Sequence, residues 1–282
     1  MSEESQSIPV VLVFSGHDPS GGAGVHADIE AIISQGCHCA SVITALTIQD
    51  TRNVMGFVEV DPALIVQQAR AILADMPVKA IKIGMIGSVA VAEVIHSILL
   101  DYPDIPVVLD PVLVASGGGA LAEEDLADAI KNLLFPLTTV LTPNAMESRR
   151  LAPGMDTVEA RGLALLEMGP QYVLVKGADE DTEMVHNLLF GGHRLLHQFN
   201  WPRLPHQYHG SGCTLAAAIA GLLAQGSDPF MAVHQAQDYT YAALENGVQL
   251  GHGQYVPHRL FWADTEESDT LAQLDPDNAS IH

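Results

Sequence analysis

Apolar and polar residues alternate in blocks along the chain. Six short runs are rich in β-branched and other apolar residues, a pattern typical of strands buried on both faces of a sheet. They cover residues 9–16, 40–48, 78–85, 106–111, 138–144 and 171–177. Intervening segments rich in Ala, Leu, Glu and Asp repeat with a period of about 3.6 residues, which predicts helices. They cover residues 62–75, 88–100, 123–134 and 156–168.

The last third of the chain shows a different pattern. Residues 186–190 and 193–199, split by Gly191-Gly192, predict an antiparallel hairpin at one sheet edge, and helices are expected at 212–225 and 230–246. Together with the alternating strands and helices upstream, this predicts an α/β fold. We expect a three-layer αβα sandwich with a mostly parallel central sheet and helices on both faces.

The domain organisation follows from the absence of breaks in this pattern. No Pro/Ser-rich linker and no internal repeat interrupts residues 8–262, so we expect a single domain there. Residues 1–7 and 263–282 are expected to be disordered tails. From Asp264 onward the chain carries six acidic residues and no Lys or Arg.

Charge narrows the possible partners. The 282 residues include 34 acids and 12 bases, a net charge of −22, which argues against nucleic acid or an anionic membrane as partner. With four lysines and eight arginines in total, a phosphate site would depend largely on backbone N–H groups and helix N-termini.

Cysteine content and hydropathy bear on the compartment. The three cysteines cannot form a framework of several disulfides, which fits a reducing cytosol. No segment approaches the roughly 20 uninterrupted apolar residues of a membrane helix, and the opening MSEESQS lacks the positive charge of a signal peptide. The sequence therefore predicts a soluble cytoplasmic protein.

A glycine-rich turn follows the first predicted strand. Its sequence, SGHDPSGGAGVHADI (residues 15–29), lets the backbone approach a ligand closely at the end of a parallel strand. It is not a P-loop, because no Gly-Lys-Ser/Thr follows. On this segment alone, a dinucleotide site and a turn that serves only packing both stay open as alternatives.

A second glycine turn opens the predicted helix at 212–225. In YHGSGCTLAAAIAGLL (residues 208–223), the N–H groups of Gly210, Ser211, Gly212 and Cys213 can form a cup at the positive end of a helix dipole, which suits a transferring phosphoryl group. Cys213 is a candidate general base whose pKa the helix N-terminus is expected to lower. The alternative is a buried structural cysteine.

Seven ordered motifs define a family resemblance over roughly residues 8–250. They are SGHDPSGGAGVHADI (15–29), SVITALTIQDTR (41–52), KIGMIGS (82–88), VVLDPVLVASGG (107–118), LTPNAMES (141–148), VLVKG (173–177) and HGSGCT (209–214). The chain resembles the hydroxymethylpyrimidine and phosphomethylpyrimidine kinases of thiamine biosynthesis, within the ribokinase-like superfamily. The resemblance assigns the first glycine turn to the pyrimidine, which removes the dinucleotide alternative.

The resemblance implies roles for individual residues. The pyrimidine pocket would contain Gly16, Asp28, Gln49, Met85 and Val112. Gln49 and Asp28 can pair with ring nitrogens and the amino group, while Met85 and Val112 supply apolar walls.

The phosphate side is implied in the same way. Asp110 and Glu147 resemble the acids that organise Mg²⁺, with Asn144 beside them, and Lys176 would reach the phosphates of ATP. Cys213 would act as base within the N–H cup. Members of this family are commonly homodimers, and we expect the same here.

The leading hypothesis is an ATP- and Mg²⁺-dependent kinase for 4-amino-5-hydroxymethyl-2-methylpyrimidine and its monophosphate. Two alternatives stay open: a kinase for pyridoxal or pyridoxine, and a catalytically impaired pyrimidine-binding protein of the same fold. The second is motivated by Ser116, which stands where many members have Lys, and by the turn KGAD (176–179), which replaces the commoner Lys-Gly-Gly-His.

Overall fold

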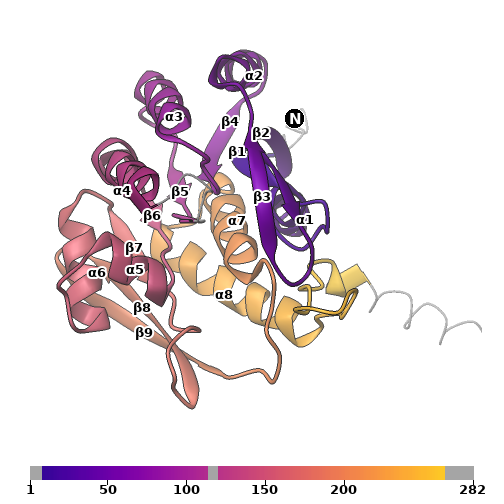
Figure 1. Ribbon diagram of the computed structural model, residues 1–282, viewed down its shortest axis with the longest axis vertical. Helices are drawn as coiled ribbons and strands as arrows, with labels where there is room; N and C mark the ends of the chain where they lie inside the picture. The colour runs from indigo at the N-terminus through magenta and orange to yellow at the C-terminus, as the bar shows by residue number, and fades with distance from the viewer. Residues whose placement is uncertain (1–7, 114–119, 264–282) are drawn as a thin grey trace, which may run out of the picture.

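A nine-stranded sheet forms the middle layer of the computed structural model, which describes residues 8–113 and 120–263 (Figure 1). The strands are β1 (Val10–His17), β2 (His38–Gln49), β3 (Val54–Glu59), β4 (Val78–Ile83), β5 (Val107–Leu109), β6 (Val140–Leu141), β7 (Tyr172–Val175), β8 (Met184–Gly191) and β9 (Arg194–Pro202). Their order across the sheet is β3-β2-β1-β4-β5-β6-β7-β8-β9. The predicted tails lie outside the described residues, except Ala263.

The sheet is parallel in its centre and antiparallel at both edges. Strands β2, β1, β4, β5, β6 and β7 pair in parallel. Antiparallel pairs join β2 to β3 at one edge and β7, β8 and β9 at the other. The mostly parallel sheet and the edge hairpin are therefore confirmed. Strand β3 was not predicted.

Helices cover both faces (Figure 1). They are α1 (Gly24–Ser34), α2 (Pro62–Asp75), α3 (Val89–Asp101), α4 (Ala120–Ala129), α5 (Ala145–Leu151), α6 (Val158–Glu167), α7 (Ser211–Ala224) and α8 (Pro229–Glu245). Helix α4 runs on into a π-helical segment, Ile130–Leu134. The short helix α5 was missed because seven residues give too few turns for a periodic signal.

Two cores lie on opposite faces of the sheet. Leu12 and Phe14 of β1 pack in the core that includes α2, α3 and α6, while Val11 and Val13 pack in the core that includes α1, α7 and α8. Successive side chains of a strand point to opposite faces, so a strand covered by helices on both sides must be apolar at every position. This is why the central strands appear in the sequence as continuous apolar runs.

Side-chain caps distinguish α1 and α7 from five other helices whose first turns the structure describes. Asp61, Ser88, Asn144, Thr157 and Asp228 each accept a backbone hydrogen bond at the start of a helix. Helices α1 and α7 begin at Ala23 and Gly210 without a side-chain cap. Both follow the glycine turns, so their first N–H groups are not occupied by a cap of their own.

Among residues 8–113 and 120–263, no helix combines the length and the apolar character needed to cross a membrane.

Candidate active site

The carboxyl ends of the parallel strands converge on two adjoining cavities. Residues that follow β1, β4, β5, β6 and β7 all reach this edge, as expected for a parallel α/β sheet. The smaller cavity has a volume of about 230 Å³ and the larger about 570 Å³. Lys176, Ser211 and Gly212 line both, so the two cavities meet at the N-terminus of α7.

The smaller cavity collects most of the residues singled out from the sequence. Its lining includes Gly16, Gln49, Met85, Asp110, Val112, Asn144, Glu147, Lys176, Gly210, Ser211, Gly212 and Cys213. These residues are far apart in the chain and are brought together by the sheet order.

Asp28 is the exception and a correction to the sequence analysis. It does not line the cavity but lies fully buried on the core face of α1, with its carboxylate 2.8 Å from Nζ of Lys82. Lys82 is equally buried and lies 3.5 Å from Oγ of Ser15. Burial opposes the positive charge of Lys82, but the Asp28 carboxylate outweighs this and raises the pKa of Lys82. Asp28 is therefore occupied by an ion pair behind the pocket.

Lys82 was missed as a functional candidate. It stands in the motif KIGMIGS, inside an otherwise apolar strand, and a lysine in a buried strand was itself a usable signal. Its partner could not be identified, because Asp28 comes from a different element.

The cup of N–H groups is formed at the start of α7. Gly210 has a left-handed backbone with φ of 82°, and Ser211, Gly212 and Cys213 open the helix without a side-chain cap. The first N–H groups of a helix and the positive end of its dipole can together bind an anion. The expected low pKa of Cys213 is wrong: burial raises the pKa of its thiol, and the charge of Lys82 offsets this only in part.

Lys176 reaches the cup from the end of β7. Its Nζ lies 2.9 Å from Oδ1 of Asp110, which also accepts a hydrogen bond of 3.1 Å from Oγ1 of Thr142. Burial disfavours the charge of Lys176, but Asp110 and Glu147 outweigh this and raise its pKa. A Cβ at Gly212 would come within 2.8 Å of Nζ of Lys176, so glycine there keeps room for the ammonium group beside the cup.

Asn144 and Glu147 form a capping box at the start of α5. The Glu147 N–H donates to Oδ1 of Asn144 at 2.7 Å, and the Asn144 N–H donates to Oε2 of Glu147 at 2.8 Å. Burial raises the pKa of Glu147 to about 7, opposed by Lys176. The box holds this carboxylate at the wall of the smaller cavity, which Asp110 also lines.

The carboxylates of Asp110 and Glu147 line the smaller cavity and are donors available there to a metal ion. In the described part of the chain no group of three or more His, Cys, Asp or Glu side chains is placed to hold an ion. The carboxylates of Asp110 and Glu147 nevertheless fit Mg²⁺, which is commonly held by one or two carboxylates plus phosphate oxygens and water. A self-sufficient protein cage is not required for this ion.

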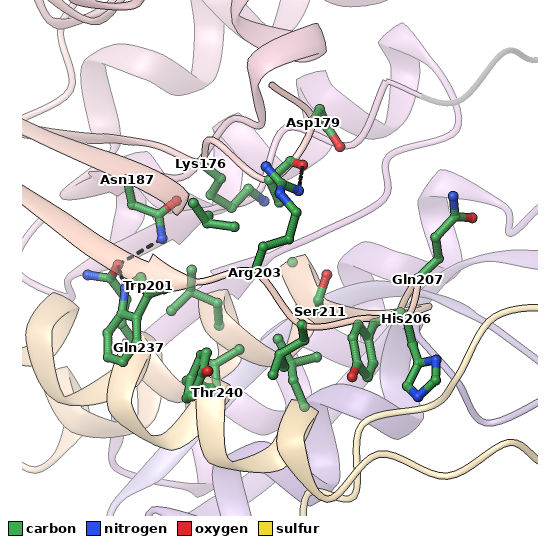
Figure 2. A pocket seen from close by; sticks show the side chains of 18 of the residues that line it. Lys176, Asp179, Asn187, Trp201, Arg203, His206, Gln207, Ser211, Gln237 and Thr240 are labelled. Atoms are coloured by element: carbon green, nitrogen blue, oxygen red, sulfur yellow. Dashed lines mark hydrogen bonds between the residues drawn. The ribbon is translucent and has the colours of Figure 1, made fainter. Parts of the chain in front are cut away.

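The larger cavity was largely unpredicted. Figure 2 shows Trp201, Gln237 and Thr240 at one end, His206 and Gln207 at the other, and Lys176 and Ser211 between them. Oε1 of Gln237 accepts hydrogen bonds from Nδ2 of Asn187 and Nε1 of Trp201, at 2.8 and 3.2 Å. These residues come from β8, β9, the loop after β9 and α8. Because they are spread over several elements, no short sequence motif predicts them.

The turn KGAD borders the larger cavity through Ala178 and Asp179. Arg203 fixes it: its guanidinium donates to the carbonyl oxygens of Ala178, Glu180 and Thr182 at 2.8 to 2.9 Å. The KGAD turn is therefore held in place by hydrogen bonds from Arg203. Ser116 lies outside the described residues.

Asp18 links the two glycine turns and was also missed. It accepts hydrogen bonds of 2.8 Å from the N–H groups of Ser20 and Ala23, and its Oδ2 lies 2.8 Å from Nε2 of His209. Burial would raise the pKa of Asp18, but these hydrogen bonds lower it to about 2. The first turn is thus tied to the segment that carries the N–H cup.

Comparison with known proteins adds family and fold. A family model described as phosphomethylpyrimidine kinase matches residues 18–258. A hydroxymethylpyrimidine/phosphomethylpyrimidine kinase of Streptomyces coelicolor is 36% identical over 87% of this chain and 92% of its own length. A thiamine biosynthetic bifunctional enzyme of Arabidopsis thaliana is 35% identical. The chain spans about half the length of such bifunctional relatives, 56% in the Arabidopsis case.

Solved structures agree with the fold. An ADP complex of Bacillus subtilis pyridoxal kinase matches with a TM-score of 0.82 and 28% identity, covering 90% of this chain and 98% of that one. A phosphomethylpyrimidine kinase of Clostridium difficile matches with a TM-score of 0.70 and 31% identity, covering 84% and 99%. The ribokinase-like architecture expected from the sequence is confirmed.

Proposed function

The chain belongs to the phosphomethylpyrimidine kinase family, and on that premise we propose that it transfers the γ-phosphoryl group of ATP to the hydroxymethyl oxygen of 4-amino-5-hydroxymethyl-2-methylpyrimidine, and then to the resulting monophosphate. One observation carries the proposal. Two cavities of different size meet at the uncapped N-terminus of α7, where Lys176 and Asp110 also lie. Such a junction can hold the transferring group between two ligands.

The larger cavity is the proposed ATP site. Its volume of about 570 Å³ and its mixed aromatic and polar lining suit a nucleotide, and Lys176 stands where the two cavities join. Asp110 and Glu147 would hold Mg²⁺, which supplies positive charge to the phosphate oxygens when bound.

The smaller cavity is the proposed acceptor site. Met85 and Val112 line it and can cover the faces of a flat ring. Nε2 of Gln49 donates to Oγ1 of Thr47 at 2.7 Å, which leaves the carboxamide oxygen to accept from the exocyclic amino group. Asp28 is too deeply buried to share this task.

The transfer step uses groups at the junction. The acceptor oxygen forms a bond to the γ-phosphorus while the bond from that phosphorus to the β,γ-bridging oxygen breaks, and ADP leaves. The N–H groups of the cup and Lys176 stabilise negative charge on the transferring group. Cys213 takes the hydroxyl proton. Because burial raises the pKa of its thiol, this step depends on the charge of Lys82 and the backbone N–H of Gly24 to favour the thiolate.

A vitamin B6 kinase is the second candidate. The pyridoxal kinase of Bacillus subtilis superposes with the higher of the two TM-scores above, and pyridoxal is also a flat heterocycle with a hydroxymethyl group. Gln49 favours the aminopyrimidine, because its carboxamide oxygen would have the amino group as a donor partner.

The test is ADP release from Mg²⁺-ATP with three acceptors offered separately: the hydroxymethylpyrimidine, its monophosphate and pyridoxal. Turnover with both pyrimidines supports the proposal. Turnover with the alcohol alone would limit the proposed function to the first phosphorylation. A preference for pyridoxal would identify a vitamin B6 kinase instead. A folded protein that binds the pyrimidine without turnover would be a binding protein instead.

A homodimer is the proposed assembly. Leu46 and Ile48 of β2, with Val58 of β3 paired to Leu46, are apolar side chains that are 48% to 63% exposed near the sheet edge. An exposed apolar face on an edge strand is a common association surface. Light scattering should give twice the chain mass, and Val58→Glu should shift the protein toward monomer. A wild-type monomer would overturn this proposal.

A further inference from the structure

Arg259 is the largest fully buried side chain in the described part of the molecule. It follows the final β-bridge, far along the chain from both glycine turns, and only 1% of its surface is exposed. Arginine is almost never fully buried unless its charge and its N–H groups have partners.

The guanidinium bridges three elements. Its Nη2 donates to the carbonyl oxygen of Gly22, and Nη1 lies 3.5 Å from that of Gly21, both in the first glycine turn. Its Nε donates to Oγ1 of Thr214 in the first turn of α7 at 2.8 Å. Nη1 also pairs with Oε2 of Glu30 in α1 at 2.9 Å. One planar cation therefore holds the acceptor turn (residues 18–24) and the start of α7.

The contact continues into the N–H cup. Oγ1 of Thr214, which accepts from Arg259, donates in turn to the carbonyl oxygen of Gly210 at 2.8 Å. The two turns also touch directly: a Cβ at Gly210 would collide with the carbonyl oxygen of Gly22, and one at Gly22 would collide with the ring of His209. A shift of either turn must move the other or break these contacts.

The backbone of Arg259 is also held in place by hydrogen bonds. Its backbone carbonyl oxygen accepts hydrogen bonds from Oγ of Ser34 at 2.8 Å and from the hydroxyl of Tyr239 at 2.9 Å. The side chain thus extends from a backbone position held by α1 and α8 toward the two turns. Side chains locked in this way can hold a reactive geometry without further ordering cost.

We propose that Arg259 is a positioning residue that aligns the acceptor turn with the N–H cup of α7. Its effect on phosphoryl transfer rests on the proposed kinase function, whereas its coupling of the two turns does not. Loss of the side chain leaves the carbonyl oxygens of Gly21 and Gly22 and the carboxylate of Glu30 without their shared cation. Misalignment of two bound reactants lowers kcat more than it weakens the binding of either one.

The first measurement is steady-state kinetics of Arg259→Ala and Arg259→Lys with the pyrimidine alcohol and ATP. We expect kcat to fall by about tenfold or more in Arg259→Ala, with each KM changed by less than about threefold. Arg259→Lys should stay impaired, because an ammonium group cannot reproduce the fork of donors. Arg70→Ala is the matched control: Arg70 pairs with Asp101 on the surface, and both side chains are about half exposed.

Chemical rescue separates positioning from a general structural role. Millimolar guanidinium should enter the space left in Arg259→Ala and raise its kcat, while leaving Arg70→Ala and the wild type unchanged. Amide hydrogen exchange should become faster in residues 18–24 and 210–214 of Arg259→Ala and not in α3. If Arg259→Ala fails to fold, the same exchange experiment on Arg259→Lys decides.

Failure of this inference can be told apart from failure of the proposed function. A wild-type protein without kinase turnover would remove the function, while the exchange experiment would still test the coupling. Wild-type kcat in Arg259→Ala would overturn the positioning role. So would a loss of kcat without rescue and with unchanged exchange in both turns.

Discussion

At the scale of single residues, Asp28 shows how burial changes the meaning of a polar side chain. Its place after the glycine turn predicts a substrate contact, yet the side chain lies on the core face of α1 and pairs with Lys82. The residue type and the spacing were compatible with both outcomes. The face of the helix decided between them.

The pair gives a stability prediction. Asp28→Asn leaves Lys82 charged in the core without its partner, and breaking a buried pair by removing one member typically costs about 3–5 kcal/mol. Urea unfolding should show this loss. Arg70→Ala, which breaks an exposed pair, should cost less than about 1 kcal/mol. An Asp28→Asn protein as stable as the wild type would show that the pair does not support the fold.

Cys213 gives a prediction about catalysis. Cys213→Ala removes the proposed base but keeps the backbone N–H groups of the cup, so we expect kcat to fall at least about tenfold, with pyrimidine affinity nearly unchanged. Calorimetric binding and ADP release measure the two effects separately. Cys39→Ala, which lies outside both cavities, serves as control. Unchanged turnover in Cys213→Ala would remove this residue from the mechanism.

At the scale of elements, the glycine turns explain why two helices differ from the others. Helices α2, α3, α5, α6 and α8 satisfy their first N–H groups with a side-chain cap, whereas α1 and α7 do not. Both uncapped helices follow a turn at the cavity edge. A helix end that lacks its own cap is available to a ligand. A capped helix can also contribute to the site, as α5 does through Asn144 and Glu147.

Packing between elements decides whether replacing a glycine stabilises or destabilises the fold. Gly162 lies inside α6, where Gly→Ala usually stabilises by up to about 1 kcal/mol. Here a Cβ would overlap the ring of Phe190 in β8. Overpacking of this kind costs about 1–3 kcal/mol, so Gly162→Ala should destabilise. Thermal unfolding should show a lower Tm, and a second substitution, Phe190→Leu, should recover part of the loss. A higher Tm in Gly162→Ala would contradict this packing.

At the scale of the whole molecule, contacts between distant segments build the site. Asp18 and His209 meet across 191 positions of the chain, and Arg259 reaches the first glycine turn from near the other end. The acid stability of the protein depends on such contacts. Hydrogen bonds to the Asp18 carboxylate stabilise its charged form in the folded state only.

The lowered pKa of Asp18 predicts that its contribution to stability decreases at acid pH. The pKa of Asp18 is lowered from 3.8 to about 2, so its contribution to stability is complete above about pH 4 and is lost as pH falls toward 2. The difference in unfolding free energy between wild type and Asp18→Asn should be largest near neutral pH and shrink across this window. Urea unfolding at several pH values measures it. A difference that stays constant with pH would show that the charge is not what matters.

The sequence by itself determined most of the element order, with β3 and α5 as the exceptions, and supplied most of the residues proposed for the chemistry. Strands buried on both faces must be apolar throughout, so the central strands and the helices between them were predictable, and α2 was placed at its observed bounds. The second glycine turn predicted the N–H cup at residues 210–213. The seven short motifs then identified the family, and with it Asp110, Glu147, Lys176 and Cys213.

Only the tertiary structure decided which side chains face the cavity and which support it from behind. Asp28, Lys82, Asp18 and Arg259 are polar residues whose partners lie on other elements, and burial then opposes or outweighs local effects, as at the Cys213 thiol. The larger cavity is likewise assembled from β8, β9 and α8 without a local motif. Sequence periodicity records the environment of one element at a time, whereas ion pairs, cavities and pKa values depend on which elements the fold places side by side.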